Sequence, residues 1–249
     1  MRRTSSPLQL ETWSLAAWPA IEQIEYDGWI LRFADGHTKR ANSVNPLHRS
    51  TISVDEKISF CEAAYAQRGL PTVFRLTPFS EPSTLDAALA TRGYERIDRT
   101  LVMMKSLDGS SDLGSHSAIR RVDLATWLNA FETFGLLSPE SMSIRRRIIG
   151  KIPSETIPMM TGSADFPTGV NLGVRDGPAI GLFALFVAER VRRNGLGHAL
   201  VNETLRIASE GGATLAYLQV EETNLPARRL YETLGFTEAY PYWYRVRDR

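Results

Sequence analysis

The stretch Val187-Ala188-Glu189-Arg190-Val191-Arg192-Arg193-Asn194-Gly195-Leu196-Gly197-His198-Ala199-Leu200 decides the fold class of this chain. The apolar run just before it, residues 179–187, predicts a buried strand, and the apolar-periodic residues 196–208 predict a helix. A glycine-bearing turn between a strand and a helix start gathers free backbone N–H groups at the partly positive helix end. Arg192 and Arg193 add cationic donors to this turn. The segment therefore predicts an anion site, for which a pyrophosphate is the natural ligand.

Two common phosphate motifs do not fit this turn. A P-loop needs Lys-Ser/Thr after the second of two glycines five apart, and the chain lacks that pattern. A dinucleotide fingerprint needs Gly or Ala where Leu200 stands. The arrangement Arg192-x-x-Gly195-x-Gly197 instead resembles the pyrophosphate loop of the GNAT superfamily of acyl-CoA-dependent N-acetyltransferases.

The residues that follow strengthen this resemblance. The helix is expected to stop at Gly211-Gly212, and residues 214–220 predict a strand. The segment Asn224-Leu225-Pro226-Ala227-Arg228-Arg229-Leu230-Tyr231-Glu232-Thr233-Leu234-Gly235-Phe236 then resembles the asparagine, tyrosine and Leu-Gly-Phe signature of the family. The clear resemblance covers residues 169–243. It implies an α/β (α+β) fold with mixed, mostly antiparallel sheets flanked by helices.

Composition excludes several other classes of protein. The 249 residues are 43% hydrophobic and 23% charged, as in ordinary globular proteins, and the net charge of +1 gives no global field toward nucleic acid. The single cysteine, Cys61, excludes an intrachain disulfide and fits a reducing compartment; its helical spacing places it in a core. No stretch approaches the about 20 apolar residues of a membrane span. We therefore expect a cytoplasmic protein with no membrane contact and, since no cluster has metal-ligand spacing, no metal site.

Two halves of the chain share one pattern. Residues 107–116 are small, polar and aperiodic, which predicts a linker. A shift of 142 positions brings Gly69 onto Gly211 (211 − 69) and Gly93 onto Gly235 (235 − 93). Both halves then follow the order helix, short strand, helix ending in Gly-aromatic, final strand. We infer two tandem GNAT-like domains, 1–106 and 117–249.

The first copy lacks the chemistry of the second. Residues 50–55, which align with 192–197, contain neither glycine nor arginine, and Leu89 stands in the place of Tyr231. Ser53 with Glu56 predicts a capping box instead. Acetyl-CoA is therefore expected only in the second copy.

Further elements are expected around these motifs. In the first half Asp35-Gly36 indicates a hairpin, residues 58–65 a helix and 72–76 a strand. In the second half the expected strands are 118–122, 156–160, 170–174 and 180–187, with a helix capped by Asp123 and another over 138–149.

The resemblance implies a set of coenzyme-binding residues. The pyrophosphate is assigned to the turn and the pantetheine arm to the strand before it, where free backbone N–H groups can also polarise the thioester carbonyl. Asn224 and Tyr231 complete the set. The residues of the turn and strand are Phe186, Val187, Ala188, Arg192, Arg193, Asn194, Gly195, Leu196, Gly197 and His198.

The catalytic roles leave alternatives open. Tyr231 is the candidate general acid for the departing thiolate, but it also suits the apolar face of a helix. Asn224 either bonds the coenzyme arm or caps a helix. Glu189 is the candidate general base, with Glu221 and Glu222 as the other carboxylates at the strand ends.

The resemblance and these residues predict an N-acetyltransferase that moves an acetyl group from acetyl-CoA to a primary amine by direct transfer in a ternary complex. The alternative is a non-catalytic acyl-CoA-binding sensor or partner module. We expect a small-molecule acceptor; a protein lysine or N-terminus would need an open groove. The segments that shape the acceptor site, 134–154 and 161–168, carry no pattern that names it, and Arg145-Arg146-Arg147 indicates a solvated helix face. Oligomeric state is not visible in the sequence.

Overall fold

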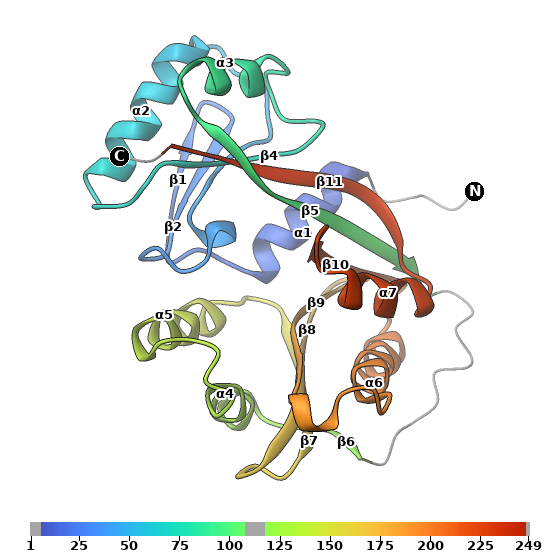
Figure 1. The fold of residues 1–249 in the computed structure, drawn as a ribbon. Helices are drawn as coiled ribbons and strands as arrows, with labels where there is room; N and C mark the ends of the chain where they lie inside the picture. Colours follow the sequence, from blue (N-terminus) through green and yellow to red (C-terminus); the bar gives the residue numbers. More distant parts are fainter. Residues whose placement is uncertain (1–5, 108–117, 248–249) are drawn as a thin grey trace.

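All eleven strands form one sheet in the computed structural model, which describes residues 6–107 and 118–247 (Figure 1). The helices are α1 (Pro7–Ala17), α2 (Val54–Ala66), α3 (Leu85–Thr91), α4 (Leu124–Glu132), α5 (Pro139–Gly150), α6 (Leu196–Glu210) and α7 (Leu225–Thr233), with short 3-10 turns η1 (Lys39–Ala41) and η2 (Glu189–Val191). The strands are β1 (Glu22–Tyr26), β2 (Trp29–Phe33), β3 (Val44–Pro46), β4 (Val73–Leu76), β5 (Glu95–Ser106), β6 (Ile119–Arg121), β7 (Glu155–Gly162), β8 (Pro167–Asp176), β9 (Ala179–Val187), β10 (Leu215–Glu221) and β11 (Thr237–Val246).

The order of the strands does not follow the two halves of the sequence. It runs β1-β2-β3-β4-β11-β5-β10-β9-β8-β7-β6, so the last strand of each half lies beside the other half. β5 pairs antiparallel with β10, and β11 pairs antiparallel with β4. β5 and β11 also pair with each other, and they cross the middle of the molecule side by side (Figure 1). The two sheets expected from tandem domains are therefore joined into one.

The predicted repeat agrees with the bounds of the elements. Adding 142 to the bounds of α2, 54–66, gives 196–208, and α6 covers 196–210. The same shift takes β4 from 73–76 to 215–218, within β10, and β5 from 95–106 to 237–248, which overlaps β11 at 237–246. The division into domains 1–106 and 117–249 stays a prediction, and residues 108–116 of the predicted linker lie outside the described residues.

Helices cover both faces of the second half of the sheet. α4 and α5 lie on one side of β8 and β9, and α6 lies on the other (Figure 1). The first face, where α1 also packs on β8 and β9, has a core that includes Trp18, Trp127 and Phe183. The second face, under α6 and α7, has a core that includes Leu200, Leu205 and Phe236. The sheet thus separates two apolar cores.

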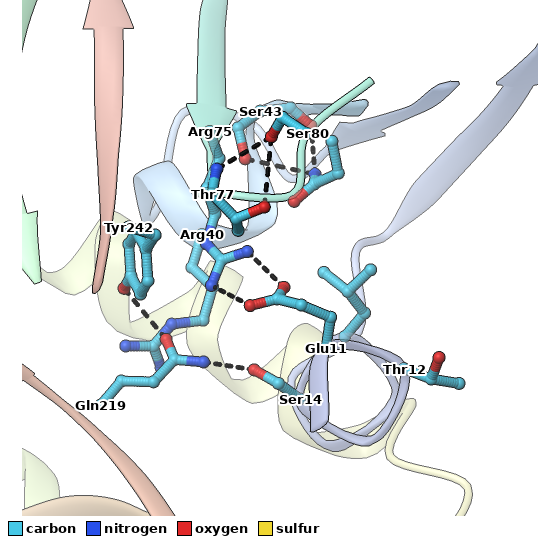
Figure 2. Close-up of polar contacts among 12 residues, drawn as sticks. Glu11, Thr12, Ser14, Arg40, Ser43, Arg75, Thr77, Ser80, Gln219 and Tyr242 are labelled. Atoms are coloured by element: carbon cyan, nitrogen blue, oxygen red, sulfur yellow. Dashed lines mark hydrogen bonds and ion pairs between the residues drawn. The ribbon is translucent and has the colours of Figure 1, made fainter. Parts of the chain in front are cut away.

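A buried polar network fixes α1 to the sheet. Glu11 and Arg75 are 0% and 1% exposed and form a two-pronged ion pair, and the Tyr240 hydroxyl donates to Glu11 at 2.7 Å. Figure 2 shows this pair beside Gln219, which lies between Ser14 and Tyr242. Two buried charges are stable only when they are paired and further hydrogen-bonded, as they are here. The network therefore connects α1, β4, β10 and β11.

Most elements expected from periodicity are confirmed, as is the α/β class. The strands 156–160, 170–174 and 180–187 lie within β7, β8 and β9, and Asp123 caps α4 by accepting from the Thr126 N–H at 2.8 Å. Cys61 is fully buried in the core of the first half, as expected. No helix within residues 6–107 and 118–247 is long and apolar enough to cross a bilayer.

The sheet predicts what happens when the first half is removed. A chain of residues 118–249 lacks β5, which lies between β10 and β11, so both strands lose a full-length partner. We expect this fragment to be insoluble or to unfold without cooperativity. Coexpression with residues 1–107 should restore a soluble complex, measured by size-exclusion chromatography. A 118–249 fragment that melts at the temperature of the full chain would contradict the role of β5.

The buried ion pair predicts a non-additive effect on stability. Arg75→Met leaves the Glu11 carboxylate buried without its charge partner and should lower the free energy of unfolding by about 3–5 kcal/mol. The double variant Glu11→Leu/Arg75→Met removes both charges and should be more stable than Arg75→Met in urea denaturation. Equal losses for the single and double variants would show that the pairing contributes nothing.

Candidate active site

Strands β9 and β10 are paired for only half of their length. They run parallel and pair over Ala179–Leu182 and Leu215–Leu218, after which both strands continue but no longer pair with each other. Ala184 has a positive φ of 50°, and the register of β9 against β8 shifts beside it, between Val170 and Leu172. Such a bulge bends a strand. β9 therefore turns away from β10 and opens a gap in the sheet.

A cavity of about 510 Å³ lies at this gap. It connects the two cores, because Tyr231 belongs to the core under α6 and α7 while Trp18 and Phe183 belong to the opposite one. Both halves of the chain contribute to its wall. The lining residues are Trp18, Thr38, Lys39, Arg40, Asp98, Thr100, Arg145, Leu182, Phe183, Ala184, Leu185, Gln219, Val220, Glu221, Asn224, Ala227, Tyr231, Tyr242 and Tyr244.

The predicted pyrophosphate turn lies directly before α6. Arg193 and Gly195 both have positive φ, 64° and 74°, and Gly195 is the residue from which α6 starts. The first N–H groups of a helix have no partner within the helix, and their end of the helix is partly positive. Residues 192–195 are exposed, so an anion can reach these groups from solvent. The Arg192 Nε donates to the Val187 carbonyl at 3.0 Å, which holds this side chain beside the end of β9.

The remaining turn residues lie near this helix start. A Cβ on Gly197 would meet Leu230 at 3.4 Å, so Gly197 lets α6 pack close to α7. The exposed His198 ring bonds Asn202 through Nδ1 at 3.1 Å and points along the helix surface. Neither contact prevents a role in anion binding. The predicted set from Arg192 to His198 is therefore brought together at one helix end.

The backbone of β9 supplies part of the expected coenzyme contacts. The Ala188 N–H donates to the Thr168 carbonyl at 2.9 Å, so it is already used on the β8 side. Because successive residues of an extended chain point their N–H groups to opposite edges, the Val187 N–H faces the gap. Of the predicted residues Phe186, Val187 and Ala188, Val187 is thus best placed to bond a ligand in the gap.

The structural roles expected of Tyr231 and Asn224 are confirmed, and both residues also border the cavity, where their proposed chemical roles stay predictions. Tyr231 is 8% exposed and packs edge-on against Phe236 at 5.9 Å, yet it also lines the cavity. Burial raises the pKa of its hydroxyl to about 12. The Asn224 side chain caps α7 by accepting from the Ala227 N–H at 3.2 Å, and it too lines the cavity.

The three candidate carboxylates lie in different surroundings. Glu189 is 86% exposed, pairs with Arg192 at 3.3 Å and does not line the cavity. Glu222 pairs with Arg99. Glu221 lines the cavity and has no ion pair among the described residues. The structure therefore brings Glu221, and not Glu189, to the gap, although Glu189 as a base stays a prediction.

In the first half, the chain's own carboxylate occupies the corresponding helix start. Ser53 caps α2 by accepting from the Glu56 N–H at 3.3 Å, as expected. Asp27 accepts from the N–H groups of Thr51 and Ile52 at 2.8 and 2.9 Å, and the buried Lys57 ammonium lies 3.6 Å away. These hydrogen bonds lower the pKa of Asp27. A carboxylate of the chain thus occupies the turn before α2, which the shift of 142 positions aligns with the turn before α6.

The sequence missed the part of the cavity formed by the first half. Trp18, Arg40 and Asp98 carry no motif, and only the exchange of β5 and β11 brings them to the gap. The expectation of a solvated face for residues 145–147 is wrong for Arg145. Its guanidinium lines the cavity, whereas Arg146 and Arg147 point outward to Glu132 and Asp35. Within the described residues no cluster of His, Cys, Asp and Glu has the make-up of a metal site.

Comparisons with known proteins agree with this geometry. The family model described as probable histone acetyltransferase Rv0428c C-terminal matches residues 4–245. The chain is 30% identical over 245 residues to the uncharacterized N-acetyltransferase YobR of Bacillus subtilis (strain 168), covering 96% of this chain and 98% of YobR. It is 27% identical over 250 residues to the probable histone acetyltransferase Rv0428c of Mycobacterium tuberculosis, covering 94% of this chain and 72% of that protein.

A solved structure shows the same fold over the whole chain. The GCN5-related N-acetyltransferase from Kribbella flavida superposes with a TM-score of 0.66 at 15% identity, covering 97% of this chain and 95% of that one. The family model and the similarity to YobR both extend over nearly all residues. The chain therefore belongs to the GNAT family of N-acetyltransferases, in the group defined by the C-terminal region of Rv0428c.

The turn before α6 predicts the effect of a charge at Gly195. A Cβ there meets no atom within 4 Å, so Gly195→Glu causes no clash; its positive φ of 74° strains the turn, and the new carboxylate lies at the anion site. We expect it to abolish acetyl-CoA binding in titration calorimetry. Gly69→Glu is the matched control, since Gly69 also has a positive φ of 68° with open space around it and lies after α2. Equal acetyl-CoA affinities of the two variants would contradict the assignment of the pyrophosphate to the turn before α6.

Proposed function

We propose that this protein transfers an acetyl group from acetyl-CoA to a primary amine by direct transfer in a ternary complex. The observation that carries the proposal is the cavity at the gap between β9 and β10, which has Tyr231 on its wall. The turn before α6 follows the end of β9 and lies outside the lining of this cavity. Membership of the GNAT family agrees with this reaction.

The turn before α6 would hold the coenzyme. Its exposed N–H groups, its two positive-φ residues and the Arg192 side chain suit a pyrophosphate. The Val187 N–H suits a group that lies along the gap, and Asn224 borders the same cavity. Since Asp27 fills the equivalent helix start in the first half, one acetyl-CoA is expected per chain.

Acetyl-CoA supplies the acetyl group as a thioester, whose sulfur leaves as a thiolate when the amine nitrogen bonds to the acetyl carbon. Tyr231 would give its hydroxyl proton to that sulfur. Because its pKa is about 12, the hydroxyl stays protonated at neutral and mildly alkaline pH. Backbone N–H groups at the gap would stabilise negative charge on the carbonyl oxygen. Glu221, which borders the cavity, is the carboxylate best placed to accept the proton of the amine, directly or through water.

Direct transfer is favoured because no suitable nucleophile borders the cavity. Cys61, the single cysteine, is fully buried in the other half. Burial raises the pKa of its thiol to about 12, so it is protonated at neutral pH. A thiol without its thiolate form is a poor nucleophile.

The alternative is a module that binds acyl-CoA and transfers nothing. The placement of Tyr231 on the cavity wall, with a hydroxyl that has no hydrogen-bond partner among the described residues, favours the enzyme. Release of free CoA from acetyl-CoA in the presence of a mixed amine panel distinguishes the two. Tight binding without CoA release for any amine would support the sensor.

The role of Tyr231 predicts a specific kinetic change. Tyr231→Phe should lower kcat by roughly 100- to 10,000-fold while leaving acetyl-CoA affinity close to that of the wild type, because the proton is needed only as the thiolate forms. Tyr217→Phe is the matched control, since Tyr217 is also buried but does not line the cavity. An unchanged kcat for Tyr231→Phe would leave Tyr231 as a core residue only.

A further inference from the structure

The cavity wall on the face of α1 and α5 carries two arginines without a counter-charge. Arg40, in η1, and Arg145, in α5, both line the cavity. The Nε atoms of both are buried and have no hydrogen-bond partner. Within residues 6–107 and 118–247, neither guanidinium forms an ion pair. Their charges therefore have no partner from the described part of the chain.

The two fully buried arginines of this region also have an Nε without a partner, but their terminal nitrogens are hydrogen-bonded, whereas those of the half-buried Arg40 and Arg145 have no partner among the described residues. Arg75 forms the two-pronged pair with Glu11. Arg32 donates to the carbonyls of Arg40, Leu15 and Trp18. A buried guanidinium without such partners is costly, and the cost is removed when an anion binds. Arg40 and Arg145 differ from Arg32 and Arg75 in that they border a cavity which a ligand can enter.

Aromatic rings hold the two arginines in place. The Arg145 guanidinium lies 5.5 Å from the Trp18 ring and 4.4 Å from Phe131. Trp18 stacks on Phe183 at 5.6 Å, and the Arg40 guanidinium lies 5.8 Å from that same Phe183 ring. The two cations thus flank one stacked ring pair. Their side chains are positioned by these rings before any ligand is present.

The charged groups around the cavity indicate which kind of acceptor it suits. Asp98 also lines the cavity, but its carboxylate forms an ion pair with Lys39 at 2.7 Å. Glu221 is the remaining carboxylate of the wall. Burial and the charge of Arg40 lower the pKa of Arg145 to about 10, and burial together with Arg145 lowers the pKa of His37. The uncompensated positive charge therefore lies on the face opposite to the α6 turn.

We infer that the acceptor is a small amine that carries a carboxylate, bound by Arg40 and Arg145, with its amino group toward Glu221 and Tyr231. The inference rests on the proposed acetyl transfer and names the class of its acceptor. A planar carboxylate matches the fork of an arginine side chain. The cavity of about 510 Å³ also receives the end of the donor, so it suits a short amino acid better than a folded protein surface.

Paired substrates test the inference on the full-length protein. CoA release is measured with short α- and ω-amino acids, each beside its own primary amide, which removes the negative charge; in the ω-amino acids the distant amine is little changed. We expect lower KM values for the acids. Amides that are used as well as the acids, or a neutral lysine-containing peptide that is used better, would overturn the inference while leaving the proposed function intact.

A matched pair of variants on α5 tests the residue assignment. Arg145→Met should raise KM for the acids by roughly 10- to 100-fold, the effect of losing a charged hydrogen bond, with no change for the amides or for acetyl-CoA. Arg145→Lys should fall between Arg145→Met and the wild type. Arg146→Met, whose arginine pairs outward with Glu132, should leave every KM unchanged. Equal effects on acids and amides would overturn the assignment. If Arg145→Met does not fold, Arg40→Gln poses the same question.

A binding measurement separates this inference from the proposed function. If no amine releases CoA, the proposed function fails. The N-acetylated forms of the same acids are then tested, with CoA, for a rise in the melting temperature of the wild type. If the melting temperature of the wild type rises and that of Arg145→Met does not, the carboxylate site is supported. If the melting temperature of the wild type does not rise, the carboxylate site is contradicted.

Discussion

The structure depends on the insertion of β5 between β10 and β11. β5 bonds to β10 from Leu215 to Glu221 on one edge and to β11 from Thr237 to Val246 on the other. Without it β10 would pair only with β9 and only as far as Leu218, so its other edge would be open along its whole length. A strand edge that no neighbour covers leaves N–H and C=O groups unsatisfied. The full pairing of β10 on one side is what allows it to separate from β9 on the other.

This constraint also determines what the cavity is made of. β5 and β11 bring Asp98, Thr100, Tyr242 and Tyr244 to the gap. The contacts of Glu11 with Arg75 and of Ser14 with Gln219 fix α1 against the sheet (Figure 2), and Tyr240 of β11 also donates to Glu11. Trp18, which follows α1, is thereby held at the cavity wall. The turn before α6 lies on one face of the sheet and the unpaired arginines on the other, so the two proposed substrates would approach the gap from opposite sides.

The sequence predicted the elements well where the signal is local. Apolar periodicity located α6 and β7 to β10 within a few residues, and Asp123 was predicted to cap α4. Ser138, expected as the first residue of a helix, is the N-cap of α5. Two local signals were overlooked: Ser6 before Pro7, which caps α1, and Asp27-Gly28, which forms the two-residue turn between β1 and β2. Both could have been found from turn and capping chemistry.

The rest could not be predicted because it depends on distant pairing. Nothing in residues 95–106 indicates that they pair with 215–221 and not with a strand of their own half. The same holds for Arg145. A run of three arginines on a helix looks solvated, and only the positions of Trp18 and Phe131 turn the first of them into the cavity. The candidate coenzyme-binding residues could therefore be predicted from sequence motifs, whereas the residues on the acceptor side could be identified only from the three-dimensional structure.

A crystal structure with acetyl-CoA bound would test the central claim most directly, since the claim is that the gap between β9 and β10 is the place of reaction. We predict the pyrophosphate at residues 192–197, the pantetheine arm beside Val187, and the sulfur facing the Tyr231 hydroxyl, with one coenzyme per chain. A coenzyme bound at the start of α2, or anywhere that leaves the gap and Tyr231 untouched, would contradict the account.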